Sequence, residues 1–192
     1  WERGQAVVSR GINRYLRNPD EADNGLDLVA DLIHRGGVTT IADAGSAPIV
    51  GSPQWENFRE SFDTDQTPFR ILHVARAGSF ENRSGESLSA KYQNDYKAST
   101  KRLVYTKGVK YMADGAMFAQ YMQMGEPGYI DGHHGEWLTP PDQLKPRIEP
   151  FWKEGFDINI HVNGDRGVDV TLDALEMLLE EHFRPDFRYI LQ

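Results

Sequence analysis

Apolar residues along the chain alternate between helical spacing and short strand-like runs. Residues 20–35 carry apolar side chains at helical spacing, at Leu26, Val29, Ala30 and Ile33, and two glycines follow as a stop signal. The β-branched run GVTTIADAG over 37–45 then predicts a buried strand. The same order returns further along. We expect helices over 55–62, 86–100, 144–152 and 168–183, and strands over 67–76, 109–113, 156–163 and 187–192.

Five strands that alternate with helices predict right-handed βαβ units and a parallel sheet of the α/β class. A doubly wound sheet usually carries a glycine-rich phosphate turn after its first strand, and the sequence has no such motif. A TIM-type (β/α)8 barrel therefore fits better, and eight units need roughly 250 residues. We expect residues 1–192 to form a single partial barrel domain, about units two to six, without the first and last barrel strands.

Two stretches depart from the regular alternation. The glycine-rich connection over 117–137 is too long for an ordinary loop, and we expect it to be functional. Pro146 and Pro150 lie inside the helical pattern of residues 144–152, which predicts a kink or a late start of that helix.

Composition narrows the classes of function. Hydrophobic residues make up 39% of the chain, as in a globular domain, and 21 Lys and Arg against 29 Asp and Glu give a formal charge of −8. Without a basic stripe, nucleic acid is not an expected partner. No apolar stretch is long enough for a membrane span, so we expect a soluble and by default cytoplasmic protein. Because cysteine is absent, any metal must be held by His, Asp, Glu or a modified Lys.

The predicted strand FDINIHVN offers the first candidate ligand. Side chains alternate along a strand, so Asp157, Asn159 and His161 share one face and apolar residues share the other. In a barrel the apolar face lies under the helices, which directs His161 into the interior near the carboxyl end of its strand. The pattern leaves two readings open: a metal ligand, or a hydrogen-bonded core histidine.

The strand GVKYMADG offers the second candidate. Lys110, Met112 and Asp114 share a face, but Lys110 and Asp114 are about 13 Å apart at about 3.3 Å per residue and cannot both contact one small ion. Burial lowers the pKa of a lysine, and the neutral amine can react with carbon dioxide to give a carbamate that bridges two cations. An ordinary ion pair is the alternative for Lys110.

Other candidates lie where the predicted strands end or in the long connection. Asp114 follows a strand as a catalytic group would, although Asp is also common in strand-end turns. His133, His134 and Trp137 are candidates for substrate contact, or else solvated and anchoring side chains of the connection. Gly164 is better explained as the turn that opens the next helix than as part of a phosphate site.

Taken together, GVTTIADAG, GVKYMADGA and INIHVNGDRGVDVTLDALE resemble the amidohydrolase 3 family of the amidohydrolase superfamily. The most specific part is IHVNGDRGVD followed by LDALE. The resemblance implies a (β/α)8 barrel with one or two divalent ions, usually zinc, that activate water for attack on an amide or related C–N bond. It implies that His161 is the metal ligand of barrel strand five and Lys110 the strand-four lysine that can be carboxylated. Asp114 matches a motif position of the family.

The resemblance also implies that the site is incomplete within these 192 residues. The family's H-x-H pair would precede Trp1, and the strand-six histidine and the late aspartate would follow Gln192, whereas a zinc site needs about three or four protein ligands. We therefore expect an internal piece, inactive alone, of a hydrolase that acts on C–N bonds other than peptide bonds in a small-molecule substrate. The alternatives are a non-catalytic half-barrel that forms homo-oligomers through its open sheet edges, and a metal-free barrel lyase or isomerase with Lys110 as an unmodified amine.

Overall fold

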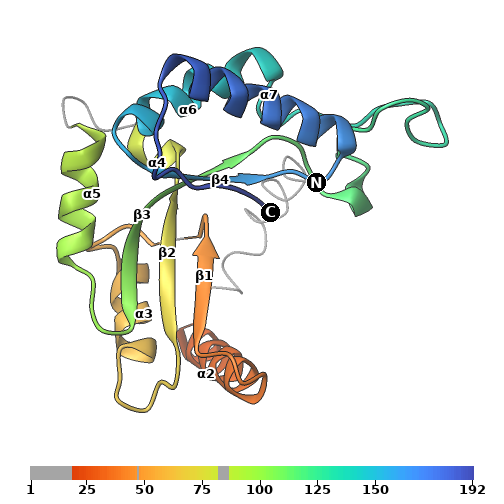
Figure 1. The fold of residues 1–192 in the computed structure, drawn as a ribbon. Coiled ribbons are helices and arrows are strands. Elements are labelled where there is room, and N and C mark those ends of the chain that lie inside the picture. Colours follow the sequence, from red (N-terminus) through yellow and green to blue (C-terminus); the bar gives the residue numbers. More distant parts are fainter. Residues whose placement is uncertain (1–18, 47, 82–86) are drawn as a thin grey trace. The chain divides into compact units, whose positions relative to one another are not determined.

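The computed structural model describes residues 19–46, 48–81 and 87–192. Five parallel strands alternate with helices and form one sheet in the order β1-β2-β3-β4-β5, which is an incomplete (β/α) barrel and confirms the predicted fold class (Figure 1). The elements are α2 (Pro19–Arg35), β1 (Thr40–Ala44), α3 (Pro53–Phe62), β2 (Arg70–Arg76), α4 (Gly78–Glu81), α5 (Leu88–Lys97), β3 (Leu103–Met112), η1 (Met117–Ala119), α6 (Pro141–Lys153), β4 (Asp157–His161), α7 (Asp165–Glu181) and β5 (Tyr189–Leu191).

Residue contacts divide the chain into two compact units. Unit 1 contains Trp1–Asp43, Pro48–His73 and Asp95–Tyr105, and unit 2 contains Ala44–Ala47, Val74–Asn94 and Thr106–Gln192. All six candidate site residues of the sequence analysis lie in unit 2, so the candidate chemistry is built within a single unit.

Unit 1 has an aromatic core around a buried histidine. Trp55 is 2% exposed and packs edge-on to His73, which is fully buried and lies 3.2 Å from the Asp43 carboxylate through Nδ1. Helix α3 begins where the sequence provides a cap, because the Ser52 hydroxyl accepts a hydrogen bond from the Trp55 amide at 3.2 Å. The cap thereby fixes the end of the helix that carries Trp55 into this core.

Unit 2 places its apolar core between the sheet and helices α6 and α7. The predicted two-faced pattern of β4 is confirmed, since Ile158 and Ile160 are fully buried in this core and Val162 is 7% exposed. Strand β3 begins at Leu103, earlier than predicted, and pairs in parallel with β4. The opposite face of these two strands is thus left for the polar side chains.

Helix α6 contradicts the predicted late start. It begins at Pro141, ahead of the predicted start, and includes Pro146 and Pro150. Each proline removes one intrahelical hydrogen bond, but Leu144 and Ile148 are fully buried and hold the helix against the unit 2 core. Tertiary packing therefore outweighs the local cost of the prolines.

The long connection between β3 and α6 is held by its own backbone hydrogen bonds. It contains the short helix η1 and an antiparallel bridge between Asp114 and Trp137, and part of it projects away from the sheet (Figure 1). The Met124 amide donates to the His134 carbonyl and the Tyr129 amide to the His133 carbonyl, both at 2.9 Å. The connection is therefore an ordered structure, and its functional role stays a prediction.

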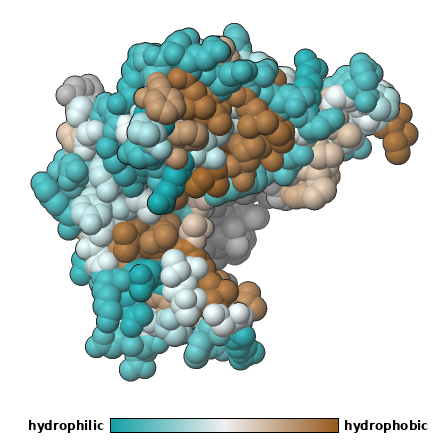
Figure 2. Space-filling model, viewed as in Figure 1, coloured by the Kyte–Doolittle hydropathy of each residue, from teal (hydrophilic) through white to brown (hydrophobic). Residues whose placement is uncertain are grey.

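Helix α7 also presents apolar side chains to the surface. Leu172 is 46% exposed and lines an open groove along α7 together with Leu175 and Leu179, and apolar surface gathers over this helix in Figure 2. Within the described part of the chain, no helix has the length and apolar character that crossing a membrane requires.

Candidate metal centre

Lys110 and His161 lie on the same face of the two central paired strands of unit 2. In the parallel register, Lys110 is opposite Asn159 and Met112 is opposite His161. All four side chains therefore share the polar face, as the alternation predicted. His161 lies on the neighbouring strand, two residues further along than the partner of Lys110, so the Cα atoms of Lys110 and His161 are about 8 Å apart. Two side chains of this length can converge on one point.

Lys110 is buried and has a neutral partner. Lys110 is 9% exposed, and its Nζ donates a hydrogen bond to Oε1 of Gln192. Gln192 in turn donates through Nε2 to Oδ1 of Asn159 at 3.4 Å. Burial lowers the pKa of Lys110 below its ordinary value of 10.5, and the nearby Arg76 lowers this pKa further. Both effects favour the neutral amine.

Arg76 reaches the same place from the end of β2. Its Nε donates to the Gly45 carbonyl at 2.8 Å, and Gly45 has a φ of +105°. A Cβ at Gly45 would lie 3.1 Å from Cγ of Lys110 and 3.4 Å from Cγ of Arg76. Glycine at this position therefore allows the two cationic side chains to pass beside the backbone.

The Asn163 amide fixes the tautomer of His161. Asn163 Nδ2 donates to the Gly115 carbonyl at 3.0 Å and lies 2.9 Å from His161 Nε2. A flipped amide would place Oδ1 against the Gly115 carbonyl, where neither atom can donate. Nδ2 therefore faces both atoms and donates to His161 Nε2, which carries no proton. The Nε2 lone pair accepts this hydrogen bond, so a metal ion at Nε2 would take the place of the Asn163 donor.

Asp114 is fully buried and organises the backbone beyond the strand ends. Oδ2 accepts hydrogen bonds from the amides of Gln123 at 2.8 Å and Gly164 at 2.9 Å, and Oδ1 accepts from the Asn163 amide at 2.9 Å. These contacts join the long connection to the start of α7, directly after the strand that carries His161. A catalytic role for Asp114 stays a prediction.

Gly164 opens α7 as the sequence predicted, and it also allows close packing. It is the N-cap residue of α7 with an ordinary φ of −81°. A Cβ at this position would lie 1.8 Å from the Gln123 carbonyl oxygen, which no side chain tolerates. The glycine of the Gly-Asp-Arg motif is therefore required because the backbone of the long connection packs directly against it at Gln123.

The three candidates in the long connection occupy different places. Trp137 is half-buried and pairs through its backbone with Asp114, at the end of β3. His133 bonds within the connection, with Nδ1 2.7 Å from Asp131 Oδ1, and stacks on Tyr129. His134 Nδ1 lies 3.0 Å from the Met124 carbonyl. The structure brings Trp137 to the strand end, whereas both histidines serve local contacts; substrate contact stays a prediction for all three.

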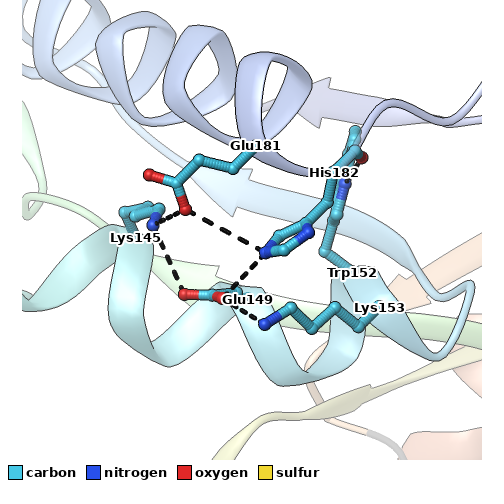
Figure 3. Close-up of polar contacts among 6 residues, drawn as sticks. All are labelled: Lys145, Glu149, Trp152, Lys153, Glu181 and His182. Atoms are coloured by element: carbon cyan, nitrogen blue, oxygen red, sulfur yellow. Dashed lines mark hydrogen bonds and ion pairs between the residues drawn. The ribbon is translucent and has the colours of Figure 1, made fainter.

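A second group of possible ligands lies between α6 and α7. Glu149, Glu181 and His182 have ligand atoms within 4.8 Å of one another. However, Lys145 pairs with both carboxylates and Lys153 pairs with Glu149 (Figure 3). Hydrogen bonds from Lys153 and His182 lower the pKa of Glu149 to about 2. Two lysines balance two carboxylates, so the group is an ion-pair network that links the helices and does not attract a cation.

Sequence reasoning missed three residues around Lys110 and His161. Arg76, Asn163 and Gln192 contact or adjoin the two ligand candidates, although none of them stands out by residue type. The same strand alternation that selected His161 could have pointed to Arg76, because it ends a predicted strand.

The comparisons with known proteins give the family. The sequence pattern described as the amidohydrolase family matches residues 2–190. The chain belongs to the amidohydrolase family. No curated protein matches this amidohydrolase chain. Two solved structures match it, and both are described as uncharacterized metal-dependent hydrolases. The one from Pyrococcus horikoshii OT3 has 19% identity and a TM-score of 0.61, and the match covers 86% of this chain and 32% of that one. The one from Pyrococcus furiosus has 22% identity and a TM-score of 0.65, and the match covers 91% of this chain and 35% of that one. The amidohydrolase chain thus has their fold and spans about a third of their length.

The donor chemistry of the amidohydrolase chain fits a divalent ion. His161 offers an unprotonated Nε2, and within residues 19–46, 48–81 and 87–192 no carboxylate pairs with Lys110. The two residues supply fewer than the three or four ligands of a zinc site. A zinc site here would therefore need further ligands.

Proposed function

We propose that the chain is the central part of a metal-dependent hydrolase that acts on C–N bonds other than peptide bonds in a small molecule. The observation that carries the proposal is the shared polar face of Lys110 and His161 in adjacent strands of an amidohydrolase fold. His161 would bind the ion, most simply zinc, through Nε2, and Lys110 would bind it as a carbamate. An ion held there would supply a water of lowered pKa as the nucleophile.

In this proposal Asp114 acts as a positioning residue. Its backbone hydrogen bonds hold the amides of Asn163 and Gly164, directly after the strand end that carries His161. Ligands from other barrel strands would complete the site, so we expect little or no turnover from these 192 residues alone.

Metal analysis of the full-length protein tests the ligand assignment. We expect His161→Ala to lose bound zinc, as measured by elemental analysis after dialysis. The matched control is His182→Ala, because His182 is also half-buried and also faces carboxylates, but in the α6–α7 network. Full zinc in His161→Ala, or loss only in His182→Ala, would refute the assignment.

A second candidate function is self-association of a non-catalytic half-barrel. The edge strands β1 and β5 favour it, because each has one neighbour in the described sheet and an unpaired strand edge can pair with another chain. Light scattering across a concentration series tests it, and a monomer at all concentrations would exclude it. A metal-free lyase or isomerase, in contrast, requires an unmodified Lys110 amine.

A further inference from the structure

Two cationic side chains adjoin each other on the polar face of unit 2, and no acidic residue of the described ranges pairs with either of them. Lys110 and Arg76 both flank Gly45, and the Ala77 amide donates to the Lys110 carbonyl at 3.1 Å, so the ends of β2 and β3 are directly paired. Lys110 Nζ bonds to an amide oxygen and Arg76 Nε to a carbonyl oxygen. Among the residues that the structure describes, neither side chain forms an ion pair.

This arrangement is costly for two positive charges. A buried ammonium is normally paired with a carboxylate, but Lys110 is 9% exposed and its partner Gln192 is neutral. Arg76 cannot lose its charge, and its field opposes a charge on Lys110. A negative group between the two side chains would remove both costs.

We propose that Arg76 is the cationic partner of a carbamate on Lys110 and stabilises this modification as a positioning residue. The inference rests on the proposed function, in which Lys110 is carboxylated. The neutral Nζ donates its lone pair to the carbon of carbon dioxide and forms an N–C bond. One C=O electron pair moves onto oxygen, and Nζ releases one proton to water. No oxidant or reductant is needed, and the side chain becomes an anion.

The surrounding contacts suit the product. The carbamate nitrogen keeps one N–H, which can still donate to Gln192 Oε1 as Nζ does now. Arg76 is held at the end of β2 through Nε, and its terminal Nη1 and Nη2 groups have no hydrogen-bond partner among the described residues. A guanidinium with free terminal groups is well matched to a carboxylate.

Carbon-13 NMR of the full-length protein in labelled bicarbonate tests the inference. We expect one carbamate carbon signal in the wild type, absent in Lys110→Arg and retained in Lys107→Arg. Lys107 is the matched control because it lies on the same strand and donates to the Glu154 carbonyl. Arg76→Gln should weaken carbon dioxide binding about tenfold, since a charged hydrogen bond is lost at a partly exposed site. Arg76→Lys, which keeps the charge, should restore most of the signal.

Each other outcome counts against a distinct claim. An undiminished signal in Arg76→Gln would overturn the role of Arg76 while carboxylation stands. Equal loss in the Gln and Lys variants would assign Arg76 to holding Gly45 and overturn the charge argument. No signal in the wild type would overturn the carbamate itself. The metal content of the His161→Ala protein is measured separately, so failure of the proposed function is recognised independently.

Discussion

Replacing Asp114 with alanine removes the acceptor of three backbone amides at once. The carboxylate is fully buried, and its partners are the amides of Gln123, Asn163 and Gly164. Gln123 and Gly164 are themselves buried, so their N–H groups would be left without water. Asn163 is exposed, and its amide can bind solvent instead. The change therefore creates two unsatisfied buried donors.

The expected loss of stability follows from these two donors. A buried unsatisfied donor costs about 1–3 kcal/mol, which gives about 4 kcal/mol for Asp114→Ala. In Asp114→Asn, one oxygen can still accept from Gln123 and Gly164, while Nδ2 would face the Asn163 amide, so we expect about 2 kcal/mol. A chain of this size loses about 2–4 °C of melting temperature per kcal/mol. The alanine variant should therefore melt roughly 8–16 °C lower.

Thermal unfolding and amide hydrogen exchange measure the effect. The amides of Gln123 and Gly164 should exchange faster in Asp114→Ala, whereas amides of the unit 1 core should be unaffected. Asp169→Ala is the control, because Asp169 is exposed on α7 and should change stability by no more than about 0.5 kcal/mol. An Asp114→Ala protein that melts with the wild type, or that keeps the Gln123 amide protected, would refute the reasoning.

Three further changes test other parts of unit 2. The folded-state pKa of Glu149 is about 2, below its ordinary value of 4.5, so its ion pairs stabilise the fold fully above pH 4.5 and lose this contribution as the pH falls towards 2. Glu149→Gln should therefore lower the denaturation midpoint at pH 7 and match the wild type near pH 2. A difference in midpoint that does not depend on pH would contradict this. Gly164→Ala places a Cβ 1.8 Å from the Gln123 carbonyl oxygen. The variant should fold poorly, or its long connection between β3 and α6 should move away from Gly164, which would be seen as rapid exchange of the Met124 amide. A wild-type exchange pattern would disprove the clash. Asn163→Ala removes a hydrogen bond of about 0.5–1.5 kcal/mol from His161 Nε2. The tautomer ratio in nitrogen-15 spectra should therefore shift about twofold to thirteenfold towards protonated Nε2. An unchanged ratio would show that Asn163 does not set it.

The sequence pattern predicted the elements of the fold where side-chain periodicity is strong. In β4, alternation alone placed Ile158 and Ile160 under the helices and His161 on the polar face, because a strand cannot turn one residue without turning the others. The prediction for α6 was wrong about a late start, since two prolines carried more weight in the sequence than the buried face of the helix does in the fold. Local propensity is a weak guide when packing fixes the helix.

The candidate site was predictable only as far as each strand can be considered alone. Lys110 and His161 were accessible from their own strands, but which neighbours reach them depends on the register between strands, which a single strand does not encode. Gln192 contacts Lys110 although 82 positions of sequence separate them, and Arg76 lies beside Lys110 at Gly45, which belongs to another segment. These neighbours decide the chemistry. A buried lysine beside a carboxylate would be a stable ion pair, whereas Lys110 has an amide on one side and a guanidinium on the other. The surroundings of Lys110, rather than its residue type, favour the carbamate over the ordinary ion pair.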